Sequence, residues 1–249
     1  MFFDALLIGW LALGVIVFFA LLFVPAPYGR HIRAGWGRQI PSRIGWVVME
    51  APAVIVFAAF YFFGSHSAPA VGTVFFAIWL LHYVHRAFIF PFRKRGGSKP
   101  MPVLMVLFGF TFNIINGYLQ GYYLFTLADP YFLTWLLDPR FLVGILIFSS
   151  GFVINIHSDN ILFLLRGEAQ NGYKIPMKGL FKWVSAPNYL GEILEWSGWA
   201  VATWSPAGAA FAFWTAANLV PRAISNHRWY RQTFPLYPRE RKILVPFVF

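Results

Sequence analysis

Apolar residues gather into long runs along this chain, and most polar residues fall in the segments between them. Seven such runs cover residues 3–24, 44–63, 70–91, 102–127, 140–165, 188–204 and 206–225. Each is close to the ~20 residues that a helix needs to cross the hydrocarbon core of a bilayer. The pattern therefore predicts an all-α integral membrane protein with seven transmembrane helices.

The basic residues predict the orientation of these helices. Nineteen of the 20 lysines and arginines follow the first, third, fifth or seventh run, or lie just inside its end, and only Arg140 does not. Basic loops stay on the cytoplasmic side, so we expect the N-terminus outside and the C-terminus in the cytoplasm. The N-terminal run lacks a basic region and a cleavage site, which favours a retained span. The shortest connection is a hairpin at Ser205 and Pro206.

Composition narrows the class of protein. The chain has 249 residues, of which 59% are hydrophobic and only 12% charged, which fits a single membrane domain over residues 1–249. It has no cysteine, so disulfides, thiolate nucleophiles and cysteine metal sites are excluded. The net charge of +11 lies in loops between apolar runs, which favours anionic lipid and a phosphorylated cofactor over nucleic acid.

Polar side chains inside apolar runs indicate a site. The last third of the chain is rich in them: Asn155, Asp159, Arg166, Asn188, Glu192, Glu195, Arg222 and Arg228. Each costs several kcal/mol to bury unless it pairs or binds something, so the cluster indicates a large polar ligand. Glu50 is the sole charge within the second run and, with Tyr83, falls at a similar depth, roughly 10 Å from the cytoplasmic end. We therefore predict a pocket that opens toward the cytoplasm.

Other motifs restrict the chemistry. Neither a G-x-G-x-x-G nor a G-x-x-x-x-G-K-[ST] motif is present, which argues against a Rossmann fold and a P-loop. His82 and His85 lack further ligands on their run, so we expect no metal site. Asn113 and Asn116 are equally consistent with helix–helix hydrogen bonds and with ligand contacts. From the residues alone, the ligand is large and anionic, but its identity stays open.

Several stretches resemble the steroid 5α-reductase family, and especially its vertebrate type 2 branch. They are LHYVHRAF at 81–88, NGYLQGYYL at 116–124, NIHSDNIL at 155–162, and long segments at 173–205 and 227–249. The resemblance implies a seven-helix membrane reductase that binds NADPH on the cytoplasmic side. It implies hydride transfer to C5 of a 3-oxo-4-ene steroid, of the testosterone or progesterone type, giving a 5α-steroid. Residues 1–100 would contribute contacts to the ketone, and residues 101–249 would mainly hold the cofactor.

The resemblance also implies roles for individual residues. Glu50 and Tyr83 would be catalytic and would hydrogen-bond the 3-ketone. Cofactor contacts would come from Arg86, Arg95, Asn155, Asp159, Arg166, Tyr173, Asn188, Glu192, Arg222, Asn226, Arg228 and Tyr230. Substrate contacts would come from Trp46, Met49, Asn113 and Trp214. Two positions depart from the family pattern, because Met49 replaces a glutamine and Asn226, which cannot titrate, interrupts a histidine run.

Three other functions remain as alternatives. A relative could reduce another conjugated alkene, such as a polyprenol, an enoyl thioester or a sterol, and only the substrate slot would differ. A membrane methyltransferase would use S-adenosylmethionine in place of NADPH. A proton-coupled transporter could use Glu50, Asp159 and Glu192 as a relay, but these carboxylates all lie in the cytoplasmic half. We expect a monomer in a bacterial inner membrane or an endoplasmic reticulum, with a lipid substrate and no nucleic acid.

Overall fold

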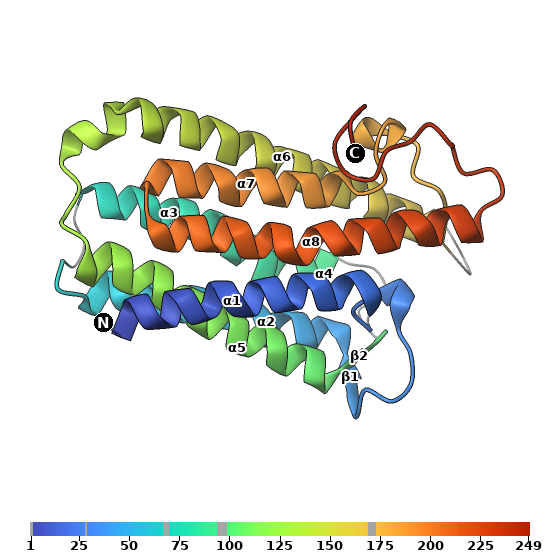
Figure 1. Cartoon of the computed structure of the whole chain (residues 1–249), viewed down its shortest axis with the longest axis horizontal. Coiled ribbons are helices and arrows are strands. Elements are labelled where there is room, and N and C mark those ends of the chain that lie inside the picture. The colour runs from blue at the N-terminus through green and yellow to red at the C-terminus, as the bar shows by residue number, and fades with distance from the viewer. Residues whose placement is uncertain (1, 28, 67–69, 94–98, 169–172) are drawn as a thin grey trace. The chain divides into compact units, whose positions relative to one another are not determined.

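The computed structural model describes residues 2–27, 29–66, 70–93, 99–168 and 173–249, and helices make up most of them. The helices are α1 (Phe2–Phe23), α2 (Ser42–Phe63), α3 (Ala70–Val84), α4 (Phe90–Arg93), α5 (Val103–Tyr122), α6 (Pro139–Glu168), α7 (Pro187–Thr203) and α8 (Pro206–Thr233) (Figure 1). A π-helical turn, His85–Ile89, joins α3 to α4, and another, Tyr123–Leu127, extends α5. Short 3-10 turns occur at Gly29–His31, Leu133–Leu137 and Gly179–Lys182.

The seven apolar runs predicted from the sequence therefore all correspond to helices. Five of them are long and apolar enough to cross a membrane: Phe2–Phe23, Ser42–Phe63, Ala70–Arg93, Val103–Leu127 and Pro139–Leu165. α7 has only 17 residues, and α8 continues well beyond its apolar part into a segment with several arginines. Among the described residues, the prediction of seven spans is thus supported for five, while seven main helices are present.

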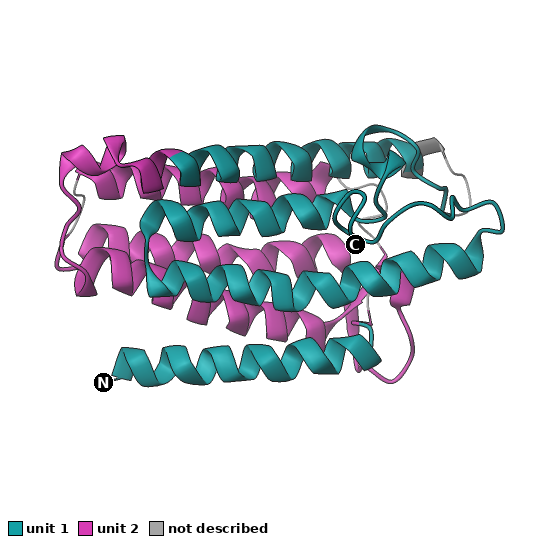
Figure 2. Cartoon of the chain, turned by 45° about the horizontal axis from the view of Figure 1, so that its top comes forward, with its two compact units in different colours: residues 1–25, 143–249 teal, residues 26–142 magenta. Residues whose placement is uncertain are grey.

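The helices form two compact units. Unit 1 contains residues 1–25 and 143–249, and unit 2 contains residues 26–142 (Figure 2). Most of the residues predicted to contact the steroid lie in unit 2, and most of those predicted to contact the cofactor lie in unit 1.

Unit 2 is organised by the contact between α2 and α5. Small residues on α5 receive large side chains of α2, because a Cβ at Gly109, Gly117 or Gly121 would meet Met49, Val56 or Phe60. The contacts move toward the C-terminal end of both helices together, from Gly109 and Met49 to Gly121 and Phe60, so α2 and α5 run parallel. A two-stranded antiparallel ladder, β1 (Gln39–Pro41) and β2 (Pro100–Pro102), precedes both helices. Its prolines lack the N–H that would continue the ladder, so it stays short.

Unit 1 is built from α1, the larger part of α6, α7 and α8. Glycines on α6 and α7 let the two backbones meet, since a Cβ at Gly151 would lie 2.3 Å from the backbone nitrogen of Glu195. α1 packs on α8, where the Trp214 ring nitrogen donates to the Trp10 carbonyl at 2.9 Å. The rest of α1 presents side chains such as Phe2 and Ile16, which are 72% and 63% exposed, as lipid-facing residues would be.

The predicted hairpin between α7 and α8 is tight. Trp204 adopts a left-handed conformation with φ of 45°, and Ser205 caps α8 by accepting a hydrogen bond from the Gly208 N–H at 2.9 Å. Beyond α8 the chain returns to the loop before α7, where the Lys242 N–H donates to the Trp183 carbonyl at 2.8 Å. The C-terminal segment is therefore an integral part of unit 1.

Candidate active site

Two amides of α5 hold the two residues predicted to be catalytic. Asn113 donates from Nδ2 to the Glu50 carboxylate at 3.1 Å and to the Met49 carbonyl at 2.8 Å. Asn116 donates from Nδ2 to the Tyr83 hydroxyl at 3.5 Å. Residues three apart lie on one face of a helix, so a single face of α5 receives both groups. The structure thus joins Glu50 from α2 and Tyr83 from α3 through α5.

Aromatic rings form the surroundings of Tyr83. Trp79 lies 4.6 Å from the Tyr83 ring and stacks on Phe57 at 4.5 Å, measured between ring centroids. Its indole N–H donates to the Ala53 carbonyl at 2.9 Å, which fixes the ring against α2. Phe57 and Trp79 are fully buried, and Tyr83 is only 3% exposed. The phenol therefore stands in an apolar wall, where a hydrogen bond to an oxygen is stronger than in water.

The other predicted residues of unit 2 that the structure describes have different surroundings. Arg86 packs against two rings, with its guanidinium carbon 4.7 Å from the Trp46 centroid and 4.6 Å from the Phe90 centroid. Trp46 and Phe90 also meet each other edge to face at 5.2 Å. Met49 packs across Gly109, because a Cβ at that glycine would lie 2.1 Å from the Met49 side chain.

Unit 1 carries a chain of hydrogen bonds between α6 and α7. Asn155 donates from Nδ2 to the Asn188 carbonyl at 2.9 Å and to the Glu192 carboxylate at 3.5 Å. Asn188 in turn donates from Nδ2 to the Asp159 carboxylate at 3.1 Å. We call these four residues the α6–α7 polar cluster. It brings together four of the predicted cofactor residues, two amides and two carboxylates.

Close backbone contact positions this cluster. A Cβ at Gly191 would lie 2.5 Å from the Asn155 backbone nitrogen, and one at Gly198 would lie 2.3 Å from the Phe148 nitrogen. No side chain can occupy such a gap, so glycine is required where the helices cross. Glu195, fully buried one turn from Glu192, lies at the same crossing. The spacing of the amides and carboxylates therefore depends on these glycines.

The remaining cofactor candidates of unit 1 are spread along α8 and the loop before α7. Asn226 donates from Nδ2 to the Tyr189 hydroxyl at 3.4 Å, which ties α8 to α7 beside the polar cluster. Tyr173 packs edge to face on Trp229 at 5.0 Å, and Tyr230 stacks on Tyr237 at 5.2 Å and is only 2% exposed. Tyr230 is thus part of an aromatic cluster at the C-terminal end of α8.

The other predicted residues lie on α8 or in segments whose side chains are not described. Arg222 is half-buried on α8, and Arg228 is exposed. Trp214 is predicted to contact substrate, but its ring packs on Trp10 at 4.6 Å and its N–H donates to the Trp10 carbonyl of α1. Arg95 lies outside the described residues, as does the side chain of Arg166.

Sequence reasoning missed one buried polar group of unit 1. The Ser185 hydroxyl lies 2.6 Å from His227 Nδ1 and 2.6 Å from the Tyr237 hydroxyl. It also donates to the Lys242 carbonyl at 3.1 Å. These residues lie 42 to 57 positions apart in the chain, so no local spacing reveals their contact.

Comparisons with known proteins give one consistent result. A family model described as 3-oxo-5-alpha-steroid 4-dehydrogenase matches residues 99–249. The chain is 48% identical to 3-oxo-5-alpha-steroid 4-dehydrogenase 1 of Macaca fascicularis, over 89% of this chain and 84% of the relative. It is 46% identical to the Homo sapiens protein of the same name, over 96% and 92%, respectively. It is 40% identical to steroid 5-alpha-reductase DET2 of Arabidopsis thaliana, over 92% and 90%. The similarity is thus to type 1 and plant enzymes, which corrects the expected type 2 branch.

Proposed function

The chain belongs to the steroid 5α-reductase family, and from this premise we propose that it saturates the 4,5 double bond of a 3-oxo-4-ene steroid. It is a multi-pass membrane enzyme of the 3-oxo-5α-steroid 4-dehydrogenase class. The observation that carries the proposal is the pairing of Glu50 and Tyr83 with adjacent amides of α5.

Proteins of this family generally use NADPH, and the donor set of unit 1 fits that cofactor. Ribose hydroxyls and a carboxamide need acceptors and donors, which the carboxylates and amides of the α6–α7 polar cluster supply. The phosphates need cations, for which we propose Arg222 and Arg228, with Arg86, Arg95 and Arg166. When bound, NADPH supplies the hydride that is added to the substrate at C5.

Glu50 and Tyr83 act on the ketone in this proposal. As C5 gains the hydride, negative charge develops on the C3 oxygen of the steroid. A phenol hydroxyl is a hydrogen-bond donor, and that of Tyr83 donates to this oxygen. Glu50 orients the phenol or shares its proton, while Asn113 fixes the carboxylate. A proton added at C4 completes the saturated ketone.

Apolar surroundings make this polarisation effective. The rings of Trp79 and Phe57 exclude water from the side of the phenol, so its hydrogen bond is not exchanged with solvent. A rigid, lipid-soluble steroid matches such an aromatic wall. We propose Trp46, Met49 and Asn113 as substrate contacts on this side. The indole N–H of Trp214, the fourth predicted contact, is hydrogen-bonded to the Trp10 carbonyl of α1.

A single assay tests the proposal. Purified protein in detergent receives NADPH with testosterone or progesterone, and oxidation of NADPH is followed together with the product by mass and retention. We expect a 5α-reduced steroid, and we expect Tyr83→Phe to form little of it although it still binds NADPH. Oxidation of NADPH without a steroid product would redirect the proposal to another conjugated alkene. A folded protein that neither binds nor oxidises NADPH would refute it.

We also propose the topology that the basic residues favour, with the N-terminus outside and the C-terminus in the cytoplasm. Because the chain has no cysteine, single cysteines are a clean probe of sidedness. Arg38→Cys and Lys182→Cys should react with an impermeant thiol reagent from the cytoplasmic side. Arg140→Cys should react from the opposite side, and the reverse pattern would overturn the orientation.

A further inference from the structure

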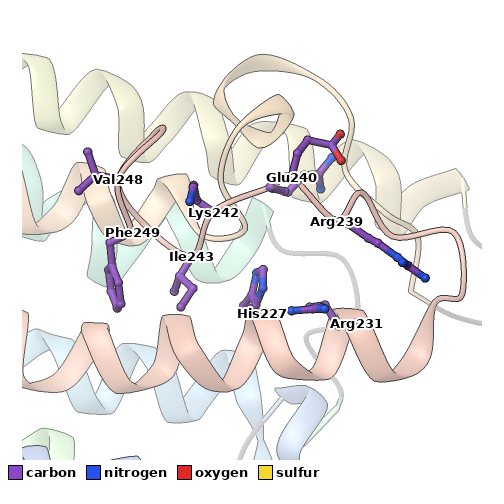
Figure 3. Close-up of a pocket in the computed structure, with 9 residues that line it drawn as sticks. His227, Arg231, Arg239, Glu240, Lys242, Ile243, Val248 and Phe249 are labelled. Atoms are coloured by element: carbon purple, nitrogen blue, oxygen red, sulfur yellow. The ribbon is translucent and has the colours of Figure 1, made fainter.

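A basic pocket at the C-terminal end of unit 1 plays no part in the function proposed above. It measures about 350 Å³ and lies between the last turns of α8 and the C-terminal segment (Figure 3). Four cations line it: Arg231, Arg239, Arg241 and Lys242. None of these four was predicted from the sequence to contact the cofactor or the steroid.

The charges of the pocket are unbalanced. Glu240 is the one acid in its lining, and Figure 3 shows its carboxylate directed away from α8, whereas His227 extends from α8 toward the C-terminal segment and Arg231 lies along the helix beside it. Within the described ranges, neither Arg231, Arg239 nor Lys242 has an acidic partner. Like charges that share a cavity repel one another, and an anion between them removes that repulsion.

Arg241 gives independent evidence of a built site. Its side chain is only 2% exposed, and its Nη1 donates to the Pro176 carbonyl at 3.1 Å. The guanidinium also lies over the Tyr237 ring, 4.8 Å from its centroid. These contacts fix the group, yet its buried Nε has no acceptor among the residues that the structure describes. A buried donor without a partner is costly, and an oxygen of a bound anion would satisfy it.

The wall behind these cations is rigid and uncharged. Ser185 holds His227 and Tyr237 at 2.6 Å each, so neither ring is free to turn. Burial, followed by the charges of Arg231 and Arg241, lowers the pKa of His227, so its imidazole is neutral at pH 7. The positive charge of the pocket therefore comes from arginine and lysine, which stay charged across the physiological range.

Apolar residues border the pocket on its other side. Ile243, Val248 and Phe249 line it, and Val248 is 75% exposed and Phe249 42% exposed. The preceding residue, Phe247, is 76% exposed. Cations beside exposed apolar side chains match a molecule with a phosphate group at one end and an acyl chain at the other.

We propose that this pocket binds a phosphate-bearing anion, supplied by the headgroup of an anionic phospholipid at the membrane surface. Soluble phosphate has the same chemistry and is the other source. The lipid is favoured because the apolar border has no role in binding a small inorganic ion. The inference concerns binding alone and does not depend on the reductase activity.

The test uses the full chain in a neutral detergent with two probes, phosphatidylglycerol and inorganic phosphate, and phosphatidylcholine as reference lipid. Retained lipid is measured by native mass spectrometry, and phosphate binding by calorimetry. We expect phosphatidylglycerol to bind in preference to phosphatidylcholine, and the variant Arg231→Gln/Lys242→Gln to weaken this binding about tenfold or more, because two charge-assisted contacts are lost. The matched control is Arg38→Gln/Lys182→Gln, which removes the same charge from exposed positions outside the pocket.

Each outcome decides the proposal. Loss of phosphatidylglycerol binding in the pocket variant alone supports the lipid as source. Binding of inorganic phosphate that competes with the lipid, and that the pocket variant loses, supports the site with a soluble anion as its source. Equal binding by pocket and control variants, or no preference over phosphatidylcholine, overturns it. Should the double variant fail to fold, Arg239→Gln removes one exposed cation and serves in its place.

Discussion

Glu50 in unit 2 and Asp159 in unit 1 are both carboxylates on long apolar helices, but their surroundings differ. Asn113 donates to Glu50, and aromatic rings such as Trp79 and Phe57 make up much of the interior around the neighbouring Tyr83. Asp159 belongs to a hydrogen-bonded series that continues through Asn188 and Asn155 to Glu192. Unit 2 therefore offers a few polar groups in an apolar wall, and unit 1 offers a connected polar surface.

This difference separates two kinds of contribution. A group that acts alone on a developing charge affects the rate, because its hydrogen bond strengthens only in the transition state. A connected set of amides and carboxylates shares the binding of a large ligand, so the loss of one member mainly weakens affinity. Substitutions of Glu50 or Tyr83 and substitutions in the α6–α7 polar cluster should therefore change different kinetic constants.

The largest effect is expected from the phenol of unit 2. Tyr83→Phe removes the hydrogen bond to the ketone oxygen and should lower kcat by roughly 10²- to 10³-fold. The dissociation constant for NADPH should stay within about twofold, because the polar cluster of unit 1 is untouched. Steady-state kinetics and NADPH fluorescence titration measure the two constants. Full activity in this variant would disprove the ketone contact.

Glu50→Gln extends the same test. The amide keeps the size of the carboxylate and can still accept from Asn113, but it cannot share a proton with the phenol. We expect kcat to fall by about 10²-fold, within the range for a positioned acid or base. An unchanged kcat together with a raised KM would instead assign Glu50 to steroid binding.

Next in size is the loss of an amide from the polar cluster. Asn188→Ala removes the donor to Asp159 and leaves that carboxylate without this partner. The dissociation constant for NADPH should rise roughly 10- to 100-fold, while kcat at saturating NADPH changes little. Titration of NADPH fluorescence gives the affinity. A fall in kcat at saturating NADPH with unchanged affinity would show that Asn188 affects the rate and not NADPH binding, which contradicts the proposed difference between the two units.

How far the sequence predicted these units depends on the kind of feature. The helices begin and end within a few residues of the apolar runs, because long hydrophobic segments satisfy their backbone only as helices in lipid. The exception is α8, which continues to Thr233 although its apolar run ends near 225. Hydropathy marks the apolar part of a helix and gives no sign of a polar extension.

The residues of the site come from the resemblance, and their roles in binding stay predictions. The structure adds that Asn155, Asp159, Asn188 and Glu192 are linked to one another by hydrogen bonds. The roles of Asn113 and Asn116 stayed open, because a mid-helix amide suits both a helix contact and a ligand. Only the three-dimensional contacts show that Asn113 donates to Glu50 and that Asn116 donates to Tyr83.

A smaller effect is expected where the helices cross. A methyl group at Gly191 would lie 2.5 Å from the Asn155 nitrogen, so Gly191→Ala must move backbone and should cost about 1–3 kcal/mol of stability. It should also weaken NADPH binding. Gly109→Ala in unit 2 meets only the flexible side chain of Met49 and should leave NADPH affinity unchanged. Gly9→Ala, with nothing within 4 Å, is the neutral control. Thermal unfolding in detergent measures the stability of all three variants, and titration of NADPH fluorescence measures their affinity. Equal losses in NADPH affinity for Gly191→Ala and Gly109→Ala would contradict the assignment of NADPH binding to the α6–α7 polar cluster.

The smallest effect concerns the second amide of α5. The Asn116 contact with the Tyr83 hydroxyl is long, at 3.5 Å, and involves two neutral groups, so it orients the phenol only weakly. Asn116→Ala should therefore lower kcat by about three- to tenfold, in line with the loss of one neutral hydrogen bond. In the Tyr83→Phe background the same substitution should have no further effect, because the hydroxyl it holds is gone. Kinetics of the double variant measure this coupling. An undiminished effect of Asn116→Ala without the hydroxyl would mean that the amide acts on the substrate directly and not through the Tyr83 phenol.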